Sequence, residues 1–72
     1  MKNKEKMKSQ IGENLKIERL KKKFSQEYLA KQSGVTLHTI SKIEAGATGD
    51  PRVLTLEKLV KALSIKIDDL LK

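Results

Sequence analysis

One stretch of the sequence, residues 26 to 44, constrains the fold more than any other, because it has the pattern of two short helices joined by a tight turn. Ser25 precedes the stretch, and its hydroxyl can accept from the free N–H groups at the start of a helix. Gly34 stands where the first helix must end, since glycine adopts a left-handed backbone at little cost. Ile40 and Ile43 are three positions apart, so they share one face of the second helix. The stretch therefore predicts two helices that cross at a tight turn.

A pair of helices that cross in this way has two interpretations. It is a helix-turn-helix unit, whose second helix can enter the major groove of DNA, or an αα-hairpin inside an ordinary helical bundle. The small side chain of Ala30 permits a close crossing, Val35 supplies an apolar plug after the glycine, and Thr36 offers a hydroxyl to cap the second helix. We favour the helix-turn-helix because these features occur together and in this order.

The composition argues against an enzyme. A chain of 72 residues buries only about 60% of its unfolded surface, which leaves little room for a catalytic pocket beside the core. It has no cysteine and a single histidine, His38, so thiolate zinc sites and sites with two imidazoles are excluded. Asp68 and Asp69 are adjacent, and neighbours on a helix point about 100° apart, so they do not form an acid–base pair. We expect no catalysis, no metal, no cofactor and no small-molecule ligand.

The charge balance favours a polyanion as partner. Sixteen Lys and Arg residues against nine Asp and Glu residues give a formal net charge of +7. Such an excess also serves solubility, so it does not specify nucleic acid by itself. No apolar run approaches the roughly 20 residues that span a bilayer, and the charged N-terminus lacks the apolar segment of a signal peptide. We expect a cytoplasmic protein without a membrane partner.

Upstream of the central stretch, a helix is expected from about Ser9 to Lys22. Ser9 is a candidate cap, although Gly12 inside the helix costs up to about 1 kcal/mol relative to alanine. Residues 1–9 are expected to form a basic N-terminal tail. The tail is either a solvated terminus with no role or an arm that lies on the phosphate backbone.

Downstream, two Gly and a Pro within residues 46 to 51 mark a loop. Thr55 is then expected to cap an amphipathic helix, whose apolar residues follow a spacing of i, i+3, i+4 and i+7: Leu56, Leu59, Val60 and Leu63. A last short helix is expected at residues 67–71, with acidic residues in its first turn, where negative charge is favourable.

The run FSQEYLAKQSGVTLHTISKIEAG, residues 24 to 46, resembles the phage repressor/Cro-like helix-turn-helix domains, also called the xenobiotic-response-element type. The SQE opening, the LA pair, the SGV turn and the IxxIE-x-G close match that family, and PRVLTLEKLVKALSIKIDDLL is similar to its fourth and fifth helices. The resemblance implies an all-α, compact five-helix phage-repressor-like domain over residues 10–72. It also implies binding to double-stranded DNA, usually as a homodimer on a symmetric operator.

Two positions depart from the family pattern. Lys23 stands where relatives often have glycine, so it must take a left-handed conformation or the chain must turn differently. Tyr28 stands where relatives usually have Glu, so a full capping box with Ser25 is missing. We expect Tyr28 to be a partly exposed packing residue.

The resemblance also indicates site residues. Base contacts are expected from the second helix of the unit, at Leu37, His38, Thr39 and Lys42. Lys42 suits guanine acceptors, and Leu37 suits a thymine methyl group. Phosphate contacts are expected from Gln26, Thr36 and Arg52. Relatives commonly place an Arg and a Glu at the positions of Arg19 and Glu44, which implies a pair across the first and third helices.

The expected role is that of a small prokaryotic transcriptional regulator of repressor or controller type. A restriction–modification controller, a phage or mobile-element repressor and a toxin-linked antitoxin all remain open. The alternative from another class is a protein-interaction module, such as an antitoxin or adaptor. The second helix of the unit, whose exposed residues are neutral or basic, favours DNA. Loop 47–54 and the last helix are the expected dimer surfaces.

Overall fold

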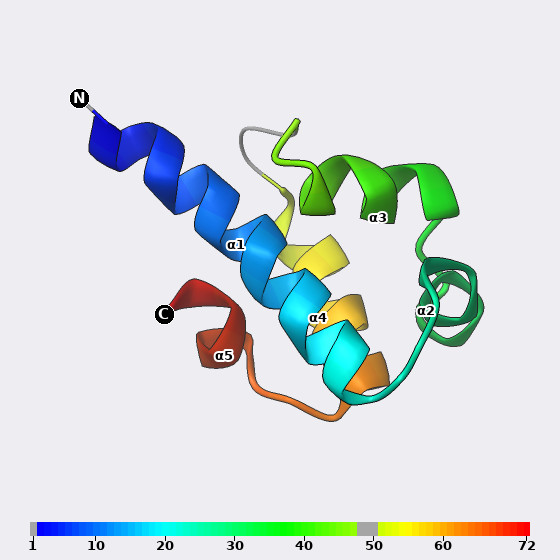
Figure 1. Ribbon diagram of the computed structural model, residues 1–72. Helices are drawn as coiled ribbons and strands as arrows, with labels where there is room; N and C mark the ends of the chain where they lie inside the picture. The colour runs from blue at the N-terminus through cyan, green and yellow to red at the C-terminus, as the bar shows by residue number, and fades with distance from the viewer. Residues whose placement is uncertain (1, 48–50) are drawn as a thin grey trace.

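The computed structural model describes residues 2–47 and 51–72, with side chains from residue 10 onward, so parts of the expected tail and of loop 47–54 lie outside the described residues. This part of the chain contains five α-helices and no strand (Figure 1), which confirms the expected all-α fold. In chain order the helices are α1 (Lys2–Lys21), α2 (Gln26–Ser33), α3 (Leu37–Glu44), α4 (Val53–Leu63) and α5 (Ile67–Leu71).

The unit formed by α2 and α3 has the expected caps. Ser25 Oγ accepts from the backbone N–H of Tyr28 at 2.9 Å, and Thr36 Oγ1 accepts from that of Thr39 at 3.2 Å. Gly34 ends α2 with φ 78°, a left-handed backbone that glycine adopts without a steric penalty. Local interactions therefore determine where α2 begins, where it ends and where α3 begins.

Two helices begin earlier than expected. α1 begins at Lys2, so Ser9 lies inside the helix and the prediction that it caps the helix is wrong. α4 begins at Val53, and Thr55 falls in its first turn, so the predicted Thr55 cap is also wrong. The N–H of Leu56 already bonds to the carbonyl of Arg52 at 3.0 Å, which shows that backbone hydrogen bonding starts directly after the loop without a side-chain cap.

The two residues that depart from the family pattern lie close together, Lys23 in the turn after α1 and Tyr28 in the first turn of α2. Lys23 adopts φ 61°, a left-handed conformation that costs a non-glycine residue about 1–2 kcal/mol. This geometry lets the N–H of Phe24 bond to the carbonyl of Arg19 at 3.1 Å. The Phe24 ring then meets the partly exposed ring of Tyr28 edge-on, with centroids 4.6 Å apart. Tyr28 is thus a packing residue, as expected.

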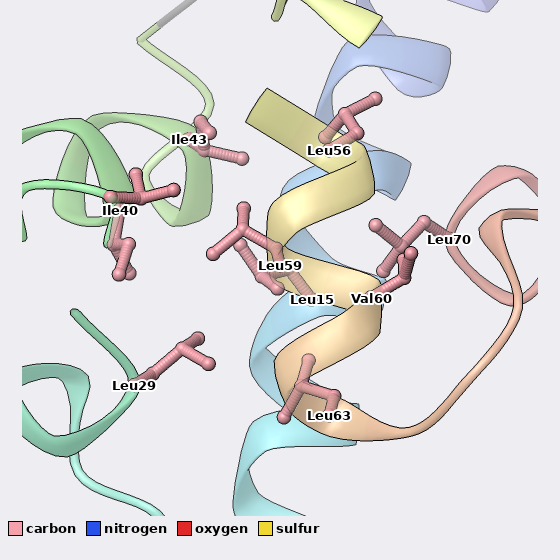
Figure 2. Packing of buried hydrophobic residues seen from close by; sticks show 10 residues of the cluster. Leu15, Leu29, Ile40, Ile43, Leu56, Leu59, Val60, Leu63 and Leu70 are labelled. Carbon is pink, nitrogen blue, oxygen red and sulfur yellow. The ribbon is translucent and has the colours of Figure 1, made fainter. Parts of the chain in front are cut away.

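The core is purely aliphatic and draws on every helix. Its buried members are Leu15, Leu29, Val35, Ile40, Ile43, Leu56, Leu59, Val60, Leu63 and Leu70. Figure 2 shows these side chains converging from several helices around α4. Burying one such side chain stabilises the fold by about 1.5–3 kcal/mol. Because Ile40 and Ile43 both point into this core, the opposite side of α3 must face outward.

Gly12 marks a point where the backbones of α1 and α3 nearly touch. The residue is buried, and a Cβ atom built on it would overlap the carbonyl oxygen of Ile43 and lie 3.1 Å from that of Glu44. The overlap with Ile43 is far inside van der Waals contact, and the approach to Glu44 is tight. A glycine that weakens the isolated helix is therefore required by the packing of α1 on α3.

Arg19 and Glu44 join α1 to α3 beside this contact, which confirms the expected pair. Arg19 Nε and Nη2 donate to the two carboxylate oxygens of Glu44 at 2.7 and 3.1 Å, and Nη1 donates to the carbonyl of Phe24 at 2.7 Å. The side chains are only 9% and 5% exposed. The guanidinium therefore ties three segments together: α1, the turn before α2, and the last turn of α3.

The close approach at Gly12 predicts that a larger residue there destabilises the protein. Gly12→Ala ordinarily stabilises a helix interior by about 0.5–1 kcal/mol. Here the added methyl must displace the backbone of α3, so we expect destabilisation of about 1–3 kcal/mol, as for an overpacked site. Urea unfolding followed by circular dichroism measures the change. Glu13→Ala, at an exposed position on the same helix, is the control and should stay within about 0.5 kcal/mol. A Gly12→Ala protein as stable as the wild type would show that the contact is loose.

Candidate nucleic-acid interface

α3 presents one stripe of side chains to solvent. His38, Lys42 and Ala45 are exposed and Ser41 is half-buried, and their spacing of i, i+3, i+4 and i+7 places them together, opposite the buried isoleucines. We call these four residues the outward face of α3. Figure 1 shows α3 at the periphery of the molecule, at the upper right of the view. Ser41 and Ala45 were not predicted as site residues, although their helical spacing from His38 was a usable signal.

Two of the predicted base-contacting residues lie at the margins of this face. Leu37 begins α3 and is exposed, whereas Thr39 is half-buried. The Thr36 hydroxyl donates to Thr39 Oγ1 at 2.9 Å, which draws Thr39 toward the start of the helix. The structure therefore brings His38 and Lys42 to the centre of the outward face and leaves Leu37 and Thr39 beside it.

The three predicted phosphate-contacting residues lie at the starts of three different helices. Gln26 is the first residue of α2, Thr36 caps α3, and Arg52 occupies the cap position of α4 with its side chain exposed. Thr36 already uses its hydroxyl oxygen to accept from the backbone of α3. Backbone and side-chain donors at helix starts are well suited to phosphate oxygens.

Gln26 has a second role that was not predicted. Its Nε2 donates to Glu44 Oε1 at 3.0 Å, and its Oε1 accepts from Ser41 Oγ at 2.9 Å. A primary amide has two N–H groups, and only one of them takes part in this bond. The side chain thus locks the start of α2 onto α3 while keeping one donor. Gln26 is 15 positions from Ser41 and 18 positions from Glu44 in the sequence, so only the folded chain reveals these bonds.

The network also sets the charge at the outward face. Glu44 is the one acidic residue of α3, and it is bonded to Arg19 and Gln26. Its negative charge is therefore compensated inside the protein. The positive charge of Lys42 remains, which suits the approach of a polyanion.

The acidic residues of α5 belong to another part of the molecule. Asp69 accepts from the backbone N–H of Lys66 at 3.0 Å, and this hydrogen bond lowers the pKa of Asp69.

Within the described residues no group of three or more His, Asp and Glu residues is arranged to hold a metal. None of the helices described is both long enough and apolar enough to cross a membrane.

Comparison with known proteins agrees with this geometry. The restriction-modification controller protein C.AhdI from Aeromonas hydrophila superposes with a TM-score of 0.81 and 31% identity, over 86% of this chain and 92% of its own. The HTH-type transcriptional repressor RghR of Bacillus subtilis (strain 168) is 40% identical over 85% of this chain. The uncharacterised HTH-type transcriptional regulator RghRB of the same organism is 36% identical over 88%. This chain spans 45% of the length of each of these two Bacillus proteins.

A family model described as helix-turn-helix matches residues 15–70. The match begins at the buried Leu15 of α1 and ends at the buried Leu70 of α5. It therefore covers the core of the domain and the whole outward face of α3. The chain belongs to the Cro/C1-type helix-turn-helix family.

Proposed function

We propose that this chain is a small prokaryotic transcriptional regulator that binds double-stranded DNA sequence-specifically and inserts α3 into the major groove. The observation that carries the proposal is the outward face of α3, a solvent-exposed stripe held from behind by Ile40, Ile43 and the Arg19–Glu44 pair. A major groove about 12 Å wide admits a helix of this kind. A regulator of this kind would act in the cytoplasm, which is the location that we propose for it.

The side chains divide into two functional groups. Lys42 and His38, at the centre of the outward face, are positioned to donate to base acceptors, and Leu37 and Thr39 make contacts at its margins. Gln26, Thr36 and Arg52 contact phosphate and fix the position of α3 on the duplex. The N–H group of Gln26 that is not bonded to Glu44 is the donor for its phosphate contact.

The protein is proposed to bind as a homodimer, at least on DNA. One helix in one groove reads only a few base pairs, and two copies on half-sites about 34 Å apart read twice as many. Exposed apolar residues at the start of α4 and in α5 suit such a contact. They are Val53, Leu54 and Leu71, with 64%, 71% and 57% exposure.

Replacing Lys42 or Arg52 by alanine tests the division into base and phosphate contacts, because each change removes one positive charge. Lys42→Ala should cost about 1–3 kcal/mol on the preferred site and relax preference at one base pair. Arg52→Ala should weaken all duplexes about equally and lower the salt slope by about one. The measurement is affinity for a selected and a scrambled duplex at several salt concentrations. If both variants reduce both affinities by the same factor, Lys42 does not read bases.

Sedimentation with and without a palindromic duplex tests the dimer. Two protein chains per duplex are expected, and Leu54→Glu should shift the assembly toward one chain, since it places a charge in an apolar contact. Gln32→Glu, which adds the same charge at an exposed position on α2, is the control and should leave assembly unchanged. A persistent complex of one chain per palindrome in the wild type would contradict the proposal.

A further inference from the structure

An open depression lies between α1, the start of α2 and the last turn of α3. It has a volume of about 380 Å³ and is lined by Lys16, Arg19, Gln26, Ser41, Glu44 and Ala45. The hydrogen-bonded network described above lines the depression, together with Lys16, whose side chain is exposed. Neither the predicted base contacts nor the predicted phosphate contacts include Lys16.

The charge of this depression comes from Lys16. Arg19 and Glu44 neutralise each other through two hydrogen bonds. Among the residues with described side chains, Lys16 has no ion-pair partner within 4.0 Å. The depression therefore carries one uncompensated positive charge on a long side chain whose ammonium group can move.

Two of the lining residues, Arg19 and Gln26, also have N–H groups beyond those in the bonds described above. Gln26 keeps one amide N–H beyond its bond to Glu44. Three of the five N–H groups of Arg19 donate to Glu44 and Phe24, and two take no part in those bonds. A positive charge beside several N–H donors is the chemistry that binds a phosphate group.

The depression adjoins the surface proposed to meet DNA. Ser41 and Ala45 line it and also belong to the outward face of α3. When a helix lies in the major groove, the phosphates of the flanking strand pass along its sides. We propose that the depression receives one backbone phosphate of DNA, which Lys16 neutralises and Gln26 bonds. This inference rests on the proposed function and extends the interface to α1.

Salt dependence distinguishes this role from that of an ordinary surface lysine. Each neutralised phosphate contributes about 0.9 to the slope of log affinity against log salt concentration. Lys16→Gln should lower the slope by about one and weaken selected and scrambled duplexes by the same factor. The matched control is Lys61→Gln, which removes the same charge from an exposed position on α4. The control should leave the slope almost unchanged, and urea unfolding of both variants should match the wild type.

A duplex with single neutral methylphosphonate linkages locates the contact. At one position per half-site, the neutral linkage should weaken binding of the wild-type protein. The same linkage should cause no further loss for the Lys16→Gln protein, which no longer neutralises that phosphate. Equal slopes for the Lys16→Gln and Lys61→Gln proteins, or additive losses at every linkage, would overturn the subsite. A wild-type protein that binds no duplex at all would instead refute the proposed function, so the two failures are distinguishable.

Discussion

The position of α3 depends on the buried pair of Arg19 and Glu44. A charge removed from water is costly unless a partner compensates it, so either residue without the other would destabilise the folded protein. The guanidinium of Arg19 donates to both carboxylate oxygens of Glu44 and to the Phe24 carbonyl, so it holds three segments in a fixed relation. Gly12 lets the backbones come close enough for the pair to form. Close backbone contact and paired charge thus fix α3 on α1.

The functional surface follows from this arrangement. Ile40 and Ile43 bury one side of α3, the ion pair neutralises its acidic residue, and the remaining side faces solvent with a positive charge at Lys42. Gln26 connects the network to α2, so the residue proposed to contact phosphate also holds the helix proposed to read bases. The proposed phosphate contact and the proposed base-reading helix are therefore held in one fixed relation. Sequence-specific binding requires this kind of preorganisation.

The parts of this account that the sequence predicts are local ones. Ser25, Gly34 and Thr36 act within one or two turns, so their caps follow from residue type and spacing. The Arg19–Glu44 pair was predictable only through family resemblance, because 25 positions separate the two residues. The starts of α1 and α4, the reason for Gly12 and the Gln26–Ser41 bond depend on loop geometry and on packing between helices. These contacts exist only after the chain has folded, so no local pattern records them.

A double-mutant cycle on the buried pair tests the central claim, that this pair positions α3 for DNA. The variants are Arg19→Gln, Glu44→Gln and both together, and the measured quantities are the free energy of unfolding and the affinity ratio between a selected and a scrambled duplex. Each single change should cost about 3–5 kcal/mol of stability, because it leaves a buried charge unpaired, and the double change should cost less than the sum. The affinity ratio should fall in each variant that remains folded. Strictly additive stability losses with an unchanged ratio would contradict the account.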